Sequence, residues 1–230
     1  MNSPLVSIIC DVYNHEPYLR RCLDGFVAQR TDFPLEILVH DDASTDGSTG
    51  IIEAYTAKHP DLFFPIFQTE NRYAKGIKIW ATYQFPRVRG KYIAFCEGDD
   101  YWTDPLKLQK QVDYMESHPE CSLCFHNAML HWEDGNQPDS VFANLEDRDY
   151  SGVELITNWL SATAAILFRA DLKDSYAQLQ MDHPLMKIGD RPLVAHCSQF
   201  GTIHGFPDIM SVYTKHTGGY TQFADARRTY

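Results

Sequence analysis

The stretch Gly90–Asp104, GKYIAFCEGDDYWTD, decides the fold. It begins with an apolar run, Tyr92 to Cys96, which is typical of a strand buried on both faces of a parallel sheet. The run stops abruptly, because Glu97, Asp99 and Asp100 then place three carboxylates within four residues. The carboxyl ends of strands form the ligand crevice of open α/β sheets, so these acidic side chains are candidates for a binding site.

Carboxylates crowded at the end of a buried strand are costly unless a cation neutralises them. Hard oxygen ligands so close together suit magnesium or manganese, and we therefore predict a metal site. The alternative is an acidic turn in which Asp99 or Asp100 caps the next helix. Asp104 followed by Pro105 already fits the start of that helix, so a second cap is not needed.

Composition limits the function classes. With 230 residues, 44% of them hydrophobic, the chain suits one large α/β domain or one domain with an added lobe. A net charge of -11 disfavours a nucleic-acid partner, which would demand a basic face. No window reaches the roughly 18 apolar residues of a membrane span, and Asp11 interrupts any signal-peptide core. We expect a cytoplasmic protein, either free or resting on the inner face of a membrane.

Six cysteines fit that compartment if they are free thiols. Cys121 and Cys124 form a C-x-x-C pair followed by His126, a pattern that occurs in zinc sites. No second pair stands at a matching spacing, and the motif lies inside the apolar run CSLCFHNAML, which favours a strand. A zinc-dependent interaction protein remains an alternative function.

The first half of the chain alternates strand and helix, which predicts right-handed βαβ units and a mainly parallel sheet. Val6–Val12 is a buried strand, and Asn14 can cap the helix that follows. The second strand, Leu35–Val39, ends in a further acidic tip that contains Asp41 and Asp42. No G-x-G-x-x-G follows the first strand and no P-loop occurs, so a glycine cradle does not hold phosphates here.

The basic residues nearest to this crevice in sequence lie in a polar loop, Asn71–Lys78. Arg72 and Lys75 can meet a phosphate there, although simple solvation of surface cations explains either one alone. A weaker strand, Leu62–Gln68, precedes the loop and a helix, Ile79–Val88, is expected after it.

The second half is less regular. An acidic loop, His131–Tyr150, is the nearest feature to a domain boundary, and Ser151 with Glu154 forms a capping box for a short helix. The other expected elements are a helix over Pro105–Ser117 with Leu106, Val112 and Met115 among its apolar positions, strands over Cys121–Leu130 and Ala164–Phe168, a helix over Pro192–Phe200, and a tail over Asp208–Tyr220.

Three segments in this order, VSIICDVYNHEPYLRRCL, EILVHDDASTDGST and GKYIAFCEGDDYWTDPLKLQKQ, resemble family 2 of the inverting glycosyltransferases. The resemblance covers Ser3–His118 strongly and the chain to about His216 more loosely. It implies the GT-A fold, a Rossmann-like and mainly parallel central sheet flanked by helices, with an acceptor-side subdomain. Residues 1–118 would then be the donor half and residues 119–230 the acceptor and catalytic-base half of one domain.

The resemblance also implies a donor nucleotide site. Asp11 and Tyr13 follow the first strand where relatives hold the base, and Tyr13 can pack on uracil. Asp42 matches the residue that accepts the N3 proton of uracil. Asp11 departs from the proline that most members show. The donor-binding residues implied are Asp11, Tyr13, Asp41, Asp42, Arg72, Lys75 and Asp99.

The run E-G-D-D corresponds to the D-x-D-D signature of the family, with Glu97 in place of the first aspartate. The resemblance places Asp99 near the ribose and the metal, and it makes Asp100 the direct ligand of a divalent ion that bridges the diphosphate. Such an ion, manganese or magnesium, stabilises the leaving diphosphate as a Lewis acid.

A catalytic base is expected at Asp190, which follows Gly189 and precedes a helix. An aspartate there is often only a helix cap, but the family presents its general base at this distance past the metal motif. The resemblance also matches the Y-x-x-H element of Tyr213 and His216, near the diphosphate. Tyr101 and Trp102 are the aromatic candidates for acceptor binding.

The predicted function is therefore transfer of a sugar, with inversion, from a UDP-sugar to a hydroxyl of a saccharide or lipid-linked acceptor. A catalytically weak module that only binds nucleotide sugars is the alternative. The sequence indicates neither the sugar nor the acceptor, and it does not indicate the oligomeric state.

Overall fold

A single mixed sheet runs through the computed structural model, which describes residues 3–186 and 188–218. Its strand order is β3-β2-β1-β4-β9-β6-β10-β5, with β7 paired to β6 and β8 to β10. Strands β3, β2, β1 and β4 are parallel, whereas β9 is antiparallel to both of its neighbours. The strands are β1 (Val6–Val12), β2 (Leu35–Asp41), β3 (Ile66–Phe67), β4 (Tyr92–Phe95), β5 (Tyr101–Trp102), β6 (Cys121–Trp132), β7 (Ser140–Val141), β8 (Arg148–Asp149), β9 (Leu167–Arg169) and β10 (Thr202–Lys215).

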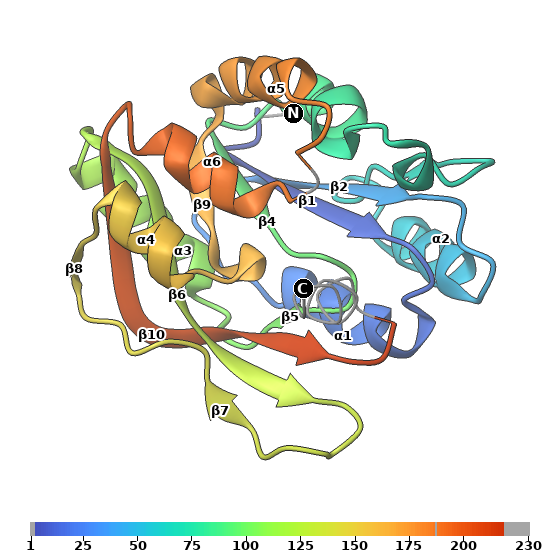
Figure 1. Ribbon diagram of the computed structural model, residues 1–230. Coiled ribbons are helices and arrows are strands. Elements are labelled where there is room, and N and C mark those ends of the chain that lie inside the picture. The colour runs from blue at the N-terminus through green and yellow to red at the C-terminus, as the bar shows by residue number, and fades with distance from the viewer. Residues whose placement is uncertain (1–2, 187, 219–230) are drawn as a thin grey trace.

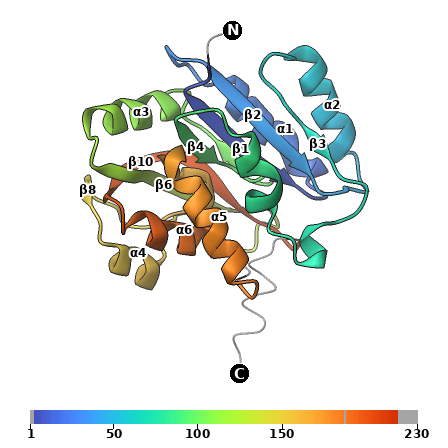
Figure 2. The ribbon, with the colours of Figure 1, turned by 90° about the horizontal axis from the view of Figure 1, so that it is seen from above.

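Helices cover both faces of this sheet. Figure 2 shows α1, α2 and α3 on one side and α4, α5 and α6 on the other. Among the described residues, no helix is long and apolar enough to cross a membrane. The helices are α1 (Glu16–Val27), α2 (Ser48–Lys58), α3 (Lys107–Ser117), α4 (Gly152–Asn158), α5 (Lys173–Asp182) and α6 (Asp190–Cys197). The prediction of a mainly parallel α/β architecture is confirmed.

Alternation along the strands divides the core into two layers. Ile8 and Ala94 pack towards α1, α2 and α3, whereas Ile9 and Phe95 pack towards α4, α5 and α6. Phe95 stacks on Trp80 with 4.3 Å between ring centres. Since successive side chains of a strand point to opposite faces, the apolar run of β4 is buried on both sides, as its sequence predicts.

The segment expected as a helix over Ile79–Val88 is instead a π-helical turn, Trp80–Gln84, followed by a 3₁₀ turn, Phe85–Arg87. Pro86 explains part of the difference, because proline lacks an N–H group and its ring clashes with a preceding α-helical turn. The inward side chain of Gln84 explains another part, since it donates hydrogen bonds to Asp11 and to the backbone of the core.

Strand β10 was not predicted. It runs for 14 residues beside β6, with register shifts at Phe206 and Ile209, and Figure 1 shows the two strands as a long pair. Gly205 and Pro207 made the sequence pattern unlike that of a strand, because both residues disfavour a strand interior unless a bulge accommodates them. Helix α5 was missed as well.

The start of α3 reverses an expectation. Leu106, expected in the core, is 44% exposed, whereas Lys107 is fully buried. The Lys107 ammonium donates a hydrogen bond of 2.8 Å to Gln111 and lies 4.1 Å from the centre of the Trp102 ring. Burial without a carboxylate partner lowers the pKa of Lys107 to about 7.

We predict that Lys107→Met stabilises the fold more at pH 6 than at pH 9. The folded pKa lies below the unfolded value, so the unfolded chain binds more protons between about pH 7 and 10, and wild-type stability rises with pH in that window. Chemical denaturation should show a gain in unfolding free energy that is roughly 2–3 kcal/mol larger at pH 6. Lys110→Met, which removes an exposed lysine from the same helix, should show no such trend. An equal gain for Lys107→Met at both pH values would contradict the account.

Candidate active site

Four carboxylates converge beyond the carboxyl ends of β1 and β4. Asp11 lies near the end of β1, Glu97 and Asp99 follow β4, and Asp190 begins α6. Burial raises the pKa of Glu97 well above its usual range, and the charges of Asp99, Asp11 and Asp190 add to the effect. We call these four residues the carboxylate cluster. The structure thus brings together acidic residues that stand up to 179 positions apart (190 − 11) in the sequence.

Two histidines face Asp99. Its Oδ2 atom lies 3.0 Å from Nε2 of His216 and 3.8 Å from Nε2 of His15. Burial acts to raise the pKa of Asp99, but the two histidines outweigh it and the pKa is lowered. Tyr18 stacks against His216 with 4.4 Å between ring centres. His216 therefore lies at the metal motif, while its predicted role at a diphosphate stays a prediction.

Sequence reasoning missed His15. It follows Asn14 in the turn after β1, and Gly98 of the acidic motif packs against it. A Cβ atom on Gly98 would lie 2.8 Å from the His15 ring, which is too close for any other residue without a shift. The glycine inside E-G-D indicates that another group approaches the backbone closely. The sequence did not indicate that this group is His15.

Asp100 lies next to the cluster and is held by β10. It is 1% exposed, and its Oδ1 atom accepts a 2.8 Å hydrogen bond from the backbone N–H of Thr214 in β10. Burial, and then the charge of Asp99, raise the pKa of Asp100 well above its usual range. Its direct role in metal binding stays a prediction, and its visible role is to join β10 to the end of β4.

Asp42 holds the loop that follows β3. Its two carboxylate oxygens accept hydrogen bonds from the backbone N–H groups of Arg72 (2.7 Å) and Tyr73 (2.9 Å). Asp41 points the other way, into the start of α2, where it accepts from the Thr49 hydroxyl at 2.5 Å. The two adjacent carboxylates therefore have different structural tasks, and the charge of Asp42 acts on Asp11 of the cluster.

The turns after β1 and β2 lock together. Asn14 accepts a hydrogen bond from the N–H of Thr45, and Asp46 accepts one from the N–H of Glu16 at the start of α1. The Glu16 carboxylate accepts in return from the N–H of Gly47. The expected cap of α1 by Asn14 is wrong, because Asn14 has a left-handed backbone (φ 56°) and a residue from the other turn receives the helical N–H.

The side chains expected at the donor phosphates lie at the rim. Arg72 and Lys75 both pair with Glu70, so both cations already have a carboxylate partner. Tyr13 is 44% exposed in the turn after β1, with its ring open to solvent. None of these contacts tests a donor role, and the three residues stay predictions.

Asp190 is the first residue of α6, two positions before the expected start. It is 7% exposed, and its two oxygens accept hydrogen bonds from the Thr163 hydroxyl (3.2 Å) and the backbone N–H of Arg191 (2.8 Å). Burial raises the pKa of Asp190, while these two hydrogen bonds act against the rise. The carboxylate is therefore oriented and partly desolvated.

The π-helical turn contacts both ends of the cluster. Gln84 donates a 2.8 Å hydrogen bond to Asp11. Trp80 packs on Gly189, where a Cβ atom would lie 2.7 Å from the indole ring, so only glycine fits beside Asp190 without a shift. Burial raises the pKa of Asp11 in spite of the opposing effects of His40, Gln84 and Trp80. Sequence reasoning missed this turn because its periodicity resembles that of an ordinary helix.

The aromatic candidates for acceptor binding differ from expectation. Trp102 is 4% exposed, its indole N–H donates to the backbone of Ala164 at 2.8 Å, and its ring packs edge-on against Phe26. It is a core residue with no face open to a sugar, which corrects the expectation. Tyr101 is partly exposed, and the Arg21 guanidinium lies 5.0 Å from its ring centre.

The C-x-x-C pair lies inside β6, and both thiols are buried in the core layer that packs towards α1, α2 and α3. Burial raises the pKa of Cys121 to about 11 and that of Cys124 well above its usual range, so both remain thiols. The Nδ1 atom of His126 forms a hydrogen bond with the backbone carbonyl of Asn127. Within residues 3–186 and 188–218, no group of three or more His, Cys, Asp or Glu side chains is arranged to hold a metal. The zinc alternative has no geometric support.

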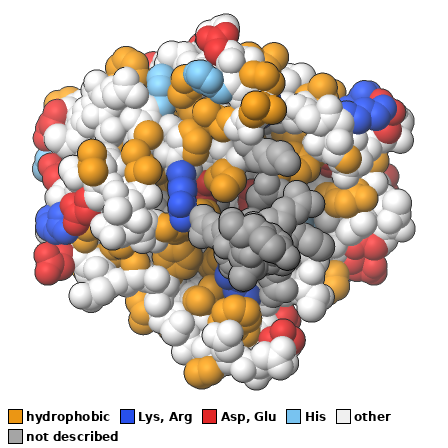
Figure 3. All heavy atoms as spheres, viewed as in Figure 1, with side chains coloured by type: hydrophobic (Ala, Val, Ile, Leu, Met, Phe, Trp, Pro, Cys, Tyr) orange, Lys and Arg blue, Asp and Glu red, His pale blue; other side chains and the backbone are white. Residues whose placement is uncertain are grey.

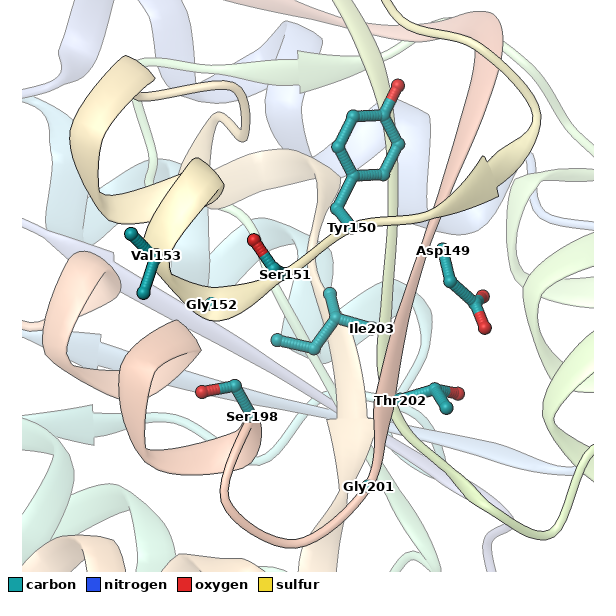
Figure 4. A pocket seen from close by; sticks show the side chains of 9 residues that line it. All are labelled: Asp149, Tyr150, Ser151, Gly152, Val153, Ser198, Gly201, Thr202 and Ile203. Atoms are coloured by element: carbon teal, nitrogen blue, oxygen red, sulfur yellow. The ribbon is translucent and has the colours of Figure 1, made fainter.

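A broad hollow lies elsewhere, at the amino end of β10 (Figure 4). Its lining includes Asp149, Ser151 and Ser198. The two serine hydroxyls already have backbone partners, since Ser151 caps α4 and Ser198 donates to Ala195. No residue predicted for the site lines this hollow, and it lies at the opposite end of the sheet strands from the carboxylate cluster.

Comparison with known proteins identifies the family. Residues 7–163 match the model of glycosyl transferase family 2, so the chain belongs to this family. A relative from Mycobacterium tuberculosis, uncharacterized protein Rv1520, is 40% identical over 228 residues. That alignment includes 97% of this chain but only 63% of the relative, so the chain spans less than two thirds of its length.

Solved structures confirm the GT-A architecture. TarS of S. aureus in complex with UDP-GlcNAc has a TM-score of 0.65 at 18% identity, over 94% of this chain and 60% of that protein. The mannosyltransferase PcManGT from Pyrobaculum calidifontis, in complex with GDP-Man and Mn²⁺, has a TM-score of 0.64 at 18% identity, over all of this chain and 66% of that protein. At such identity the likeness concerns the fold alone.

We predict that Thr163→Val raises the pKa of Asp190 further, because it removes a hydrogen bond that favours the ionised carboxylate. Carboxyl-carbon NMR titration measures this change without any substrate. Thr163→Ser, which keeps the hydroxyl, should leave the pKa near the wild-type value, and so should Ser161→Ala in the same segment. A Thr163→Val titration that matches wild type would show that the hydroxyl does not orient Asp190.

Proposed function

We propose that this chain is the catalytic domain of an inverting glycosyltransferase that moves a sugar from a UDP-sugar to a hydroxyl group of a saccharide or lipid-linked saccharide. The observation that supports the proposal is the carboxylate cluster, in which the charges of Asp99 and Asp190, from different elements, both act on Glu97. Family membership supports the reaction class.

The donor nucleotide is assigned to the side of the site that holds Asp42 and Tyr13. A carboxylate has about four lone-pair sites, so Asp42 can bind two backbone N–H groups and still accept the N3 proton of uracil. The exposed Tyr13 ring is available to pack on the base. Guanine also presents an N–H group to a carboxylate, so UDP- and GDP-sugars have to be compared directly.

The residues present fit a divalent cation. The Oδ1 atom of Asp99 and the Oδ2 atom of Asp100 are both buried, and neither has a hydrogen-bond partner among the described residues. Magnesium and manganese sites in phosphate-transfer enzymes use one or two carboxylates plus substrate phosphates, so a complete protein cage is not required. Asp100 and Asp99 would hold the ion, and when bound the ion would supply Lewis-acid stabilisation of the leaving diphosphate.

Asp190 acts as the general base in this proposal. Thr163 and the N–H of Arg191 fix its carboxylate, and its raised pKa makes it a stronger base than an exposed aspartate. Asp190 removes the proton of the acceptor hydroxyl while the oxygen attacks the anomeric carbon. A single displacement inverts that carbon, because no covalent sugar intermediate forms on the protein.

We also propose a cytoplasmic location, at or near the inner face of a membrane if the acceptor is lipid-linked. All six cysteines are free and buried, which agrees with a reducing compartment. We propose a UDP-sugar and a hydroxyl-bearing saccharide as the partners of this site.

The proposal predicts that Asp190→Asn reduces transfer at least about 100-fold while UDP binding changes little, because only the base is lost. Asp99→Asn should instead remove the increase in UDP affinity that Mn²⁺ gives. Product release with a panel of UDP-sugars and acceptors measures the first effect, and calorimetry with UDP measures the second.

Asp174→Asn is the matched control, because that carboxylate is exposed on α5. It should behave as wild type in both assays. Transfer that persists in Asp190→Asn would contradict the role of the base. UDP binding without transfer or donor hydrolysis, in both wild type and Asp190→Asn, would favour a module that only binds nucleotide sugars.

A further inference from the structure

A small recess opens beside Asp190, between α4 and α6. Its cavity volume is about 10 Å³, which is room for about one group the size of a water molecule, and the recess is open to solvent beyond that. Most of the lining is apolar and comes from Leu155, Ile166 and Val194. Its polar part includes Asp190 and the indole of Trp159. Figures 1 and 2 show α4 and α6 side by side on one face of the sheet. We call this hollow the α4–α6 recess.

Trp159 has an unusual backbone conformation. Its φ of 42° and ψ of 72° lie in the left-handed region, at the residue that ends α4. Helices often end in this conformation, but with glycine, because a side chain is strained there. A bulky residue at positive φ is a genuine outlier, and such strain persists where the surrounding structure or a function requires the side chain. The termination of α4 therefore does not explain why a tryptophan, and not a glycine, stands at this position.

The indole N–H of Trp159 has no acceptor. Its Nε1 atom is buried, and none of the described residues accepts a hydrogen bond from it. The Arg191 guanidinium lies 3.6 Å from the ring centre and covers one face of the indole. A buried donor without an acceptor is costly, so the position favours a ligand that brings a carbonyl oxygen.

The recess thus offers three kinds of contact close together. Asp190 receives the proton of an attacking hydroxyl, the Trp159 N–H donates to an oxygen acceptor, and the apolar walls accept a methyl group. A sugar with an acetamido group next to a ring hydroxyl carries all three complementary groups. A plain hexose lacks both the amide oxygen and the methyl group.

We propose that the α4–α6 recess binds the acetamido group of an N-acetylhexosamine acceptor, with Trp159 donating to its carbonyl oxygen and its methyl group lying against Leu155, Ile166 and Val194. This assignment rests on the proposed function, since it takes Asp190 to be the base. Hydrogen-bonding sites reject analogues that lack the matching group, because the buried donor is then left unpaired. The recess therefore acts as a determinant of acceptor specificity.

Ligand-observed NMR tests the recess without turnover. The probes are the methyl β-glycosides of N-acetylglucosamine and of glucose, each added to wild type and to Trp159→Phe. In the wild type, saturation transferred from the protein should reach the acetyl methyl protons of the acetamido sugar. The wild type should also bind this sugar roughly tenfold more tightly than the glucoside. Trp159→Phe keeps the ring but lacks the N–H, so this preference should fall to near unity. Equal binding of both sugars by wild type, or an unchanged preference in Trp159→Phe, would overturn the proposal.

Two further variants guard against trivial loss of folding. Trp132→Phe changes a tryptophan at the end of β6, away from the recess, and should keep the wild-type preference. Trp159→Gly removes the indole and suits the left-handed backbone, so it should melt at or above the wild-type temperature while it loses the preference. Retention of the preference in Trp159→Gly would contradict the proposal.

Donor assays separate this inference from the proposed function. Trp159→Phe should leave the ratio of UDP-N-acetylglucosamine to UDP-glucose hydrolysis unchanged, and a change in that ratio would show that the recess contacts the donor instead. Binding of the acetamido sugar that depends on Trp159, in a protein that transfers no sugar, would support the recess as a binding site and contradict the glycosyltransferase proposal.

Discussion

Mutual repulsion of buried carboxylates is the constraint on which the rest of this structure depends. Parallel strands deliver their acidic tips to one edge of the sheet, and the fold holds them there at an electrostatic cost. Neighbouring groups offset part of it: Gln84 donates to Asp11, His15 and His216 face Asp99, and hydroxyl and backbone donors hold the base candidate. The remaining charge makes the site complementary to a cation and a phosphate-bearing ligand.

The second half of the chain completes the surroundings of Asp99 and Asp100. Strand β10 crosses the sheet from its amino end to the metal motif, where Thr214 binds Asp100 and His216 reaches Asp99. Helix α6 then supplies Asp190 from the opposite layer. In the view of Figure 3, hydrophobic side chains are spread over the described part of this face, and most acidic side chains lie near its edge.

The sequence predicted those features of the site that follow from the direction of the strands. Asp11 and Asp99 follow apolar runs of parallel strands, so their convergence could be inferred before any coordinates were known. It failed where side-chain direction decides: Trp102 is next to the motif in sequence, yet it points into the core, and Lys107 is buried against it. The left-handed Trp159 has no pattern in the sequence, because only tertiary contacts can hold a tryptophan in that conformation.

The central claim is that the carboxylate cluster receives a uridine diphosphate through a divalent cation. Crystals soaked with UDP and Mn²⁺, measured at the manganese absorption edge, test it most directly. The account predicts an anomalous peak within coordination distance of a carboxylate oxygen of Asp99, with diphosphate oxygens around it and the uracil ring next to Asp42. Manganese and diphosphate bound away from Asp99 and Asp42 would contradict the account.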